Sequence, residues 1–194
     1  MTRIVAGTLG GRRIAAPPGE RTRPTSDRVR EALFSALDAM VEIDGARFLD
    51  LYAGSGAVGL EALSRGAGHV LLVESDPRAA RVVRENIAAL RAAPAARLVV
   101  GKVAQVLGAG AAGEAYAPAG EPYDVVFADP PYAVPDEEIA AMLAALVDGG
   151  WLAADAVVVV ERSSRTGPVD WVQGITAERS RRYGETTLWY GRRS

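Results

Sequence analysis

Along this chain, short continuous apolar runs alternate with longer segments whose apolar residues recur at helical spacing. The continuous runs predict buried strands at 48–52, 70–74, 97–100 and 123–128, and a fifth strand formed by 151–152 with 157–161. The segments between them predict helices at 57–65, 77–92, 102–107 and 136–148, and one that begins near Asp27 after a capping Ser26 or Thr25. Repeated strand–helix units favour an α/β fold, with a mostly parallel sheet and helices on both faces.

Both ends of the chain depart from this alternation. Residues 3–14 form two β-prone runs around Gly10-Gly11, which is a hairpin signal, and residues 15–24 predict a loop. Near the other end, 169–173 and 186–190 predict two strands that are joined by an arginine-rich loop into an antiparallel hairpin at one sheet edge. Residues 108–122, rich in Gly and Ala, predict a flexible loop. We therefore expect a β-hairpin arm at 1–24 and one domain at 25–194.

The composition is that of a globular protein. Of the 194 residues, 49% are hydrophobic and 24% are charged, and cysteine is absent. The absence of cysteine excludes disulfides, thiolate metal sites and cysteine nucleophiles. No long charge-free apolar stretch predicts a membrane span, and the N-terminus lacks the apolar core of a secretory signal. We expect a cytoplasmic protein with no metal and no membrane partner, and nothing in the sequence demands more than a monomer.

The formal net charge of −2 conceals two basic ends. Residues 1–30 carry seven arginines against two acidic residues, and residues 179–194 carry five against one. Forked guanidinium donors suit phosphate oxygens, so this distribution favours a nucleic-acid partner. A codon bias towards arginine, with solvated side chains, would explain the composition equally well. The arginines that we expect to contact RNA are Arg3, Arg12, Arg13, Arg23, Arg28, Arg30, Arg181 and Arg182. Arg28 and Arg30 point to different faces of their helix, so only one of them needs to meet a phosphate.

A glycine-rich loop, Gly54-Ser55-Gly56-Ala57-Val58-Gly59, follows the first core strand and opens a helix. This G-x-G-x-x-G context is typical of nucleotide cofactors, because glycines let the backbone turn sharply close to a ligand. Glu74, at the end of the next strand, can accept hydrogen bonds from ribose hydroxyls. The pattern alone fits a dinucleotide or S-adenosylmethionine. Asp50 favours the latter, because a carboxylate before the loop suits the cofactor's amino group and would repel a pyrophosphate.

The tetrad Asp129-Pro130-Pro131-Tyr132 follows the fourth strand and therefore belongs to the same rim of the sheet. An exocyclic base amine is a poor nucleophile because its lone pair is delocalised into the ring. The Asp129 carboxylate and the Pro130 carbonyl, held by the rigid prolines, can accept its two N–H groups and return electron density to nitrogen. Tyr132 offers a flat face for an extruded base. The tetrad thus predicts methyl transfer to an amine without a metal or a covalent intermediate.

At this point the sequence resembles the amino-methyltransferases with an Asp/Asn-Pro-Pro-aromatic motif. More narrowly, it resembles the bacterial 16S ribosomal RNA guanine-N2 methyltransferase family, of the small-subunit methyltransferase D type. The resemblance covers most of the chain and rests on the segments 3–7, 23–34, 48–56, 59–67 and 129–132. Of these, 23–34 (Arg-Pro-Thr-Ser-Asp-Arg-Val-Arg-Glu-Ala-Leu-Phe) and 59–67 are the family-specific ones.

The resemblance implies a Rossmann-like domain that uses S-adenosylmethionine to methylate a guanine of 16S rRNA within the 30S subunit or its assembly intermediate. It places the segment with Arg23, Thr25 and Ser26 near the methionine end of the cofactor or the target base. Many relatives have a polar residue after the third strand that can reach adenine; here the Val103 and Ala104 backbone takes that place. The expected cofactor-binding residues are Asp50, Ala53, Gly54, Ser55, Gly56, Glu74, Ser75, Val103, Ala104, Asp129 and Thr25.

Two alternatives remain open. A DNA adenine-N6 methyltransferase would use the same tetrad, although the chain has no obvious target-recognition domain. A non-catalytic RNA-binding assembly protein could retain the fold without the activity. The tetrad itself does not distinguish guanine from adenine.

Overall fold

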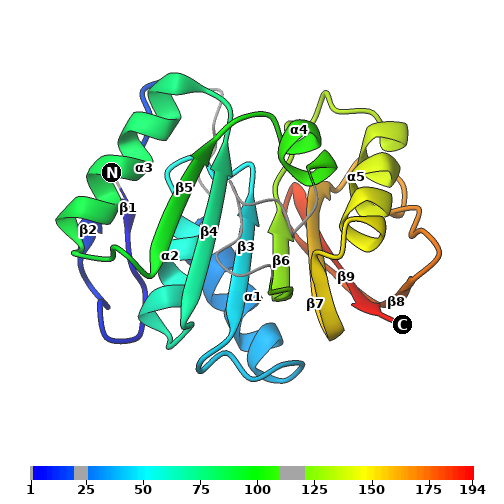
Figure 1. Cartoon of the computed structure of the whole chain (residues 1–194), viewed down its shortest axis with the longest axis horizontal. Helices are drawn as coiled ribbons and strands as arrows, with labels where there is room; N and C mark the ends of the chain where they lie inside the picture. Colours follow the sequence, from blue (N-terminus) through cyan, green and yellow to red (C-terminus); the bar gives the residue numbers. More distant parts are fainter. Residues whose placement is uncertain (1, 20–25, 110–120) are drawn as a thin grey trace.

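The computed structural model describes residues 2–19, 26–109 and 121–194, and its centre is a seven-stranded sheet (Figure 1). The strands are β3 (Arg47–Leu51), β4 (His69–Glu74), β5 (Ala96–Val100), β6 (Tyr123–Ala128), β7 (Leu152–Ser163), β8 (Ile175–Tyr183) and β9 (Thr186–Arg193). They lie in the order β5-β4-β3-β6-β7-β9-β8. Strands β3 to β7 are parallel, and β9 pairs antiparallel with both β7 and β8. The predicted α/β fold with a mostly parallel sheet is confirmed.

The strand order reverses between β3 and β6, which are neighbours although two strand–helix units separate them in sequence. Leu51, the last residue of β3, is in register with Val73 of β4 and with Ala128 at the end of β6. Two crossovers leave this point in opposite directions, so a crevice opens outside the carboxyl ends of β3 and β6. The glycine loop follows β3 and the tetrad follows β6, so both predicted motifs lie at this crevice.

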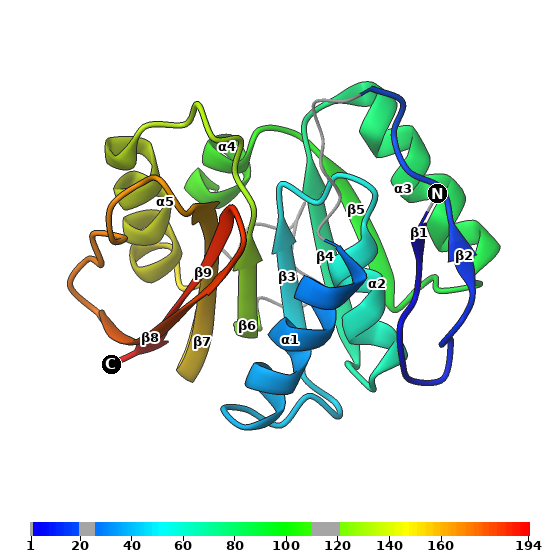
Figure 2. The ribbon, with the colours of Figure 1, turned by 180° about the vertical axis from the view of Figure 1, so that it is seen from behind.

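In the described ranges, five helices cover the two faces of the sheet: α1 (Asp27–Asp38), α2 (Ala57–Ser64), α3 (Pro77–Ala89), α4 (Val103–Gly108) and α5 (Asp136–Asp148). Helices α1, α2 and α3 pack on one face and α4 and α5 on the other (Figure 2). The Ser26 hydroxyl caps α1 by accepting a hydrogen bond from the amide of Val29. Leu33, Phe34 and Leu37 of α1 are fully buried, as their spacing predicts. None of the helices in the described ranges is long and apolar enough to cross a membrane.

The N-terminal hairpin consists of β1 (Thr2–Arg3) and β2 (Arg13–Ile14), and it belongs to the main core rather than standing apart from it. Ile4 and Ile14 are buried in the same cluster as α1, α2 and α3. Gly7 rests on the end of α2 so closely that a Cβ there would lie 1.9 Å from the carbonyl oxygen of Ser64. Only glycine fits at this position, which also has a positive φ of 83°.

Of the two strands predicted near the C-terminus, 186–190 is confirmed as part of β9, but the prediction for 169–173 is wrong. Residues 169–173 form no strand; Val169, Trp171 and Val172 are apolar because they pack against the core on the α5 side. The arginine-rich segment that we predicted to be a loop is strand β8. It pairs antiparallel with β9, and a turn at Gly184 connects the two strands. Most β8 residues are exposed on both faces of this edge strand, so no alternation of apolar and polar residues marks it.

Candidate active site

The glycine loop begins with backbone conformations that most residues avoid. Tyr52, directly after β3, has a positive φ of 59°, and Gly54 and Gly56 have values of 60° and 82°. Gly56 is the N-cap of α2, so the chain turns from strand to helix within five residues. A non-glycine residue held at positive φ is a strained position that functional sites often contain. We did not predict Tyr52 as a site residue, and only its place beside the glycine motif could have indicated it.

Two carboxylates hold the glycine loop in place by accepting hydrogen bonds from its backbone amides. Asp50 is buried, and its Oδ2 accepts a hydrogen bond of 2.9 Å from the amide of Gly59. Glu74 accepts one of 2.7 Å from the amide of Gly54 and one of 2.9 Å from the amide of Asp76. Burial raises the pKa of Asp50 well above its ordinary value; the Gly59 amide opposes this shift and the charge of Glu74 adds to it. Both predicted cofactor carboxylates therefore shape the loop directly.

Asn86 of α3 joins the loop to the N-terminal arm, a role that no sequence pattern indicated. Its Oδ1 accepts a hydrogen bond of 2.8 Å from the amide of Ala15, and its Nδ2 donates to the carbonyls of Ala15 and Ser55 at 2.9 Å each. The side chain is 2% exposed, so these bonds form away from water. They fix the arm residues Ala16 and Pro17 against the glycine loop.

Tyr52 lines two cavities. The smaller, of about 40 Å³, lies over the glycine loop and is also lined by Asp50, Gly54, Ser55 and Pro17. The larger, of about 560 Å³, extends towards α4 and α5. Its lining includes Ser75, Val103, Ala104 and Pro131. Of the predicted cofactor residues, some line the smaller cavity, others line the larger one, and Gly56, Glu74 and Asp129 line neither.

The tetrad begins at the end of β6, where the Asp129 amide donates a 3.3 Å hydrogen bond to the carbonyl of Leu51. This bond joins the tetrad to the strand that carries the glycine loop. Pro130 is buried, whereas Tyr132 is 51% exposed, an uncommon state for a large aromatic side chain. The Tyr132 hydroxyl lies 3.5 Å from that of Thr186, at the start of β9. The first two residues of the tetrad are therefore fixed in place, and its tyrosine ring remains accessible.

Asp129 has an unusual electrostatic environment. Burial raises its pKa well above the ordinary value, and the nearby negative charges of Glu161 and Asp50 raise it further. In such surroundings the ionised carboxylate is unfavourable unless it accepts hydrogen bonds or lies next to a positive charge. The site is therefore complementary to a ligand that brings N–H donors or a cation.

Arg162 of β7 fixes the segment after the tetrad. Its side chain is 3% exposed, and Nη2 donates a 2.8 Å hydrogen bond to the carbonyl of Val134. The same nitrogen lies 3.5 Å from Asp136 at the start of α5. Nothing in the sequence singled out this arginine, because a buried partner for a strand arginine is visible only in three dimensions.

The predicted RNA-contact arginines do not form one group. Arg3, Arg12, Arg13 and Arg28 are exposed, and Arg3 also pairs with Asp27 at 3.0 Å. Arg181 and Arg182 alternate to opposite faces of β8, and Arg182 donates to the Gly184 carbonyl. Thr25 and Arg23 lie outside the described residues.

The prediction for Arg30 is wrong. Its side chain is fully buried and donates to the Arg3 carbonyl and to Asp27, while Nη1 lies 4.0 Å from Glu61. A phosphate cannot reach it. Helical spacing separated Arg28 from Arg30 correctly, but it could not tell which of them faced the core.

No group of three or more potential metal ligands occurs in the described ranges, and the site chemistry rests on carboxylates, carbonyls and aromatic faces. The crevice at the switch point contains a glycine loop, an acidic strand end and an Asp-Pro-Pro-Tyr tetrad. These features place the protein in the class of Rossmann-like enzymes that use a nucleotide-containing cofactor.

Comparisons with known proteins identify the family within this class. The family model described as "Conserved hypothetical protein 95" matches residues 2–192, and the chain belongs to this family. The chain is similar to ribosomal RNA small subunit methyltransferase D of Escherichia coli K12, with 40% identity over 173 residues, which span 87% of this chain and 80% of that protein. The protein of the same name from Haemophilus influenzae is 36% identical over 160 residues, which span 82% and 77% of the two chains. A solved structure of the Escherichia coli protein yhhF has a TM-score of 0.82 at 34% identity and covers 99% of this chain and 97% of its own.

Proposed function

We propose that this protein transfers a methyl group from S-adenosylmethionine to N2 of a guanine in 16S ribosomal RNA of the small subunit. The observation that carries the proposal is the junction at Leu51, which hydrogen-bonds to the tetrad and is followed directly by the glycine loop. The curated relatives named as small-subunit rRNA methyltransferases support the RNA substrate. The cytoplasm, where ribosomes assemble, is the compartment this activity requires, and a monomer suffices for it.

The residues around Tyr52 suit the proposed cofactor. The small cavity beside Asp50 and Gly54 has room for the ammonium group at the methionine end, which the buried Asp50 carboxyl complements. The large cavity, which Ser75, Val103 and Ala104 line, is the place for the nucleoside, with Glu74 at the end of the adjoining strand for the ribose. Bound there, S-adenosylmethionine supplies an electrophilic methyl group.

The chain's own residues then prepare the nucleophile. Asp129 and the Pro130 carbonyl accept the two N–H groups of the guanine amine and draw it away from conjugation with the ring. Pro130 is buried, so its carbonyl is held in position. Tyr132 stacks against the base, and its hydroxyl is steadied by Thr186. The proton released as the amine is alkylated passes to Asp129 or to water.

The test combines methyl transfer with cofactor binding. Methyl-labelled S-adenosylmethionine is incubated with 30S subunits that lack the modification, with the wild-type protein or with the Asp129→Ala variant. We expect label in 16S rRNA with the wild type and none with the variant. Calorimetry should show that both proteins bind S-adenosylhomocysteine. Full activity of the variant would contradict the role of Asp129, and tight binding of NAD instead would contradict the cofactor.

A further inference from the structure

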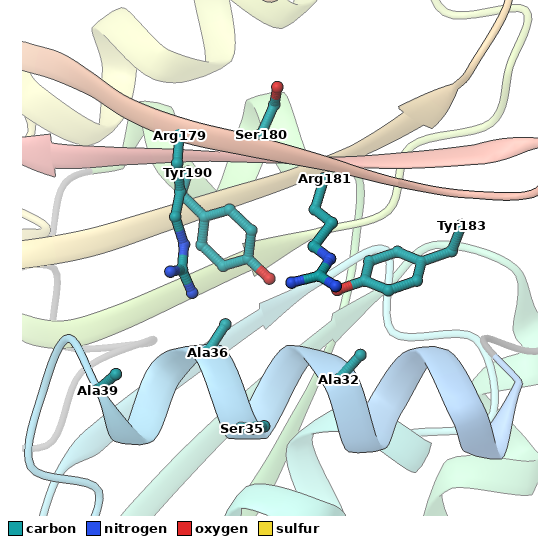
Figure 3. Close-up of a pocket in the computed structure, with 9 residues that line it drawn as sticks. All are labelled: Ala32, Ser35, Ala36, Ala39, Arg179, Ser180, Arg181, Tyr183 and Tyr190. Carbon is teal, nitrogen blue, oxygen red and sulfur yellow. The ribbon is translucent and has the colours of Figure 1, made fainter.

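A groove runs between helix α1 and strand β8, on the face of the molecule that α1 covers (Figure 3). It encloses about 520 Å³, within the range of roughly 300–1,000 Å³ that ligand sites occupy. Its floor is the α1 face with Ala32, Ser35, Ala36 and Ala39, and its opposite wall is formed by Arg179, Arg181, Tyr183 and Tyr190. The helix side chains are all small, so they leave the space between helix and sheet open.

The wall combines cations with aromatic rings. Arg179 lies over the Tyr190 ring, with 5.1 Å from its guanidinium carbon to the ring centroid, and Arg181 lies 6.0 Å from the Tyr183 ring. Strand alternation puts both guanidinium groups on the side that faces α1, while Ser180 points away (Figure 3). Neither arginine pairs with a carboxylate in the described part of the chain. Two cations that share a groove without an acidic partner suit an anionic ligand.

Tyr190 provides an independent indication of a ligand. Its side chain is 1% exposed, yet its hydroxyl has no hydrogen-bond partner among the described residues. Burial raises the pKa of Tyr190 to about 12, so the hydroxyl keeps its proton and remains a donor. A buried donor without a partner costs free energy unless something accepts its proton. The hydroxyl lies between the two guanidinium groups (Figure 3), where an anionic oxygen would satisfy it.

One end of the groove lies close to the tetrad. Tyr183, at one end of the groove, pairs in the sheet with Thr186, and the Thr186 hydroxyl lies 3.5 Å from that of Tyr132. Arg28, exposed and one helical turn before Ala32, extends the same face of α1 beyond the groove. Cationic and aromatic side chains therefore lead away from the residue on which the target base is proposed to stack.

We propose that this groove binds the sugar-phosphate backbone of the RNA strand adjacent to the target nucleotide, with Arg179, Arg181 and the Tyr190 hydroxyl at a phosphate. The inference rests on the proposed RNA substrate and adds the site that holds the flanking strand. Arginine with tyrosine is the combination that single-stranded RNA sites use, because guanidinium groups contact phosphates and rings contact bases or sugars. Holding the neighbouring phosphate would position the target base against Tyr132.

The first test measures the affinity of the protein for protein-free 16S rRNA transcribed in vitro, across a series of salt concentrations and without cofactor. For the double variant Arg179→Ala/Arg181→Ala we expect about a tenfold weaker Kd. The salt slope should be shallower by about 0.7 for each phosphate that the variant no longer neutralises. Arg97→Ala, an exposed arginine on the opposite edge strand β5, is the matched control and should change neither quantity.

The second variant, Tyr190→Phe, separates ligand binding from folding. It removes only a buried hydroxyl that has no partner among the described residues, so its stability to urea should equal or exceed that of the wild type. Its affinity for 16S rRNA should nevertheless fall about tenfold, since the variant cannot donate a hydrogen bond to a charged phosphate. Unchanged RNA affinity of this variant and of the double arginine variant would overturn the proposal.

Methyl transfer to 30S subunits distinguishes the remaining outcomes. A raised KM with little change in kcat for both variants supports the groove as a substrate site. A raised KM for subunits with unchanged affinity for protein-free rRNA would mean that the groove contacts a ribosomal protein, which overturns the proposal. If the wild type transferred no methyl group but bound rRNA through the groove, the proposed activity would fail and the groove would stand.

Discussion

Asp129 lies between two other carboxyl groups, those of Glu161 and Asp50, at the end of a buried strand. Burial and these charges raise its pKa, so the side chain is poorly suited to an empty site and well suited to one that holds amine donors or a cation. The same residue is thus a source of instability in the free protein and the centre of the proposed chemistry. This conflict between stability and function is common at active sites.

The first prediction concerns Asp129→Asn. In the unfolded chain Asp129 loses its proton near its ordinary pKa, whereas in the folded protein it keeps the proton to higher pH. The folded state therefore binds more protons in that window, and wild-type stability falls as pH rises through it. The variant does not have this pH-dependent destabilisation, so its stability advantage should be larger at pH 8 than at pH 5 in urea denaturation. Its kcat should fall by about 10²–10³-fold, as when one preorganised hydrogen-bonding group is removed.

The control for this prediction is Asp170→Asn, an exposed aspartate in the segment between β7 and β8. It should leave both kcat and the pH dependence of stability as they are in the wild type. Equal pH dependence in Asp129→Asn and in the wild type would show that Asp129 is not held in the electrostatic environment described.

A second prediction concerns the buried side chain of Asn86. Asn86→Ala leaves the amide and carbonyl of Ala15 and the carbonyl of Ser55 without their partner. We expect a decrease of about 2–4 kcal/mol in the free energy of unfolding, because buried polar groups lose their hydrogen bonds. Affinity for S-adenosylhomocysteine should fall about tenfold, measured by calorimetry, since the arm no longer closes the cavity over the glycine loop. Asn86→Asp keeps only the bond from the Ala15 amide and should give an intermediate decrease; wild-type affinity in both variants would exclude the positioning role.

At the scale of elements, Glu61 of α2 is the residue that attaches the N-terminal hairpin. It is fully buried and accepts hydrogen bonds from the amides of Val5 and Ala6 and from Arg65, while the buried Arg30 guanidinium lies 4.0 Å away. Hairpin, α1 and α2 therefore share one charged junction. Such a junction is weak evidence for net stability, but breaking one side leaves a buried charge uncompensated.

We predict that Glu61→Ala lowers the free energy of unfolding by about 3–5 kcal/mol, the usual cost of removing one partner from a buried ion pair. Brief trypsin treatment should then cleave at Arg12 or Arg13, which the wild type protects by docking the hairpin on α2. Glu61→Gln retains an acceptor for the hairpin amides and should unfold at an intermediate urea concentration. A wild-type urea midpoint for Glu61→Ala would contradict this account of the hairpin.

How far the elements could be predicted depended on how each one is buried. Helix α1 has a buried stripe at Leu33, Phe34 and Leu37 and a capping Ser26, so periodicity located it. Strand β8 is exposed on both faces and carries no such pattern, so its residues resembled a loop. Residues 169–173 had the opposite property: their apolar side chains pack on the core without pairing in the sheet. A pattern of apolar residues indicates which side chains are buried. It indicates a strand only where the buried residues also pair in a sheet.

At the scale of the whole molecule, the tetrad and the glycine loop could be assigned to one rim from the sequence because parallel strands end together. The sequence could not show that their two strands are neighbours at the switch point, nor that Tyr52 separates two cavities. The arginines of the hairpin and those of β8 lie on opposite sides of the molecule, because the hairpin contacts α3 through Arg12 and β8 is the far edge of the sheet (Figures 1 and 2). Arg28, which belongs to the same basic end as the hairpin, lies instead on α1, the helix that faces β8. Charge counted along a chain does not reveal this separation.

Identification of the modified nucleoside shows directly whether this protein methylates N2 of a guanine in 16S rRNA. Unmethylated 30S subunits are incubated with the wild-type protein and S-adenosylmethionine, the 16S rRNA is digested to nucleosides, and these are analysed by mass spectrometry. We expect N2-methylguanosine approaching one per subunit with the wild type, and only a small fraction of that with Asp129→Asn over the same incubation. The appearance of N6-methyladenosine instead, or of no methylated nucleoside while the protein binds S-adenosylhomocysteine, would contradict the proposed function.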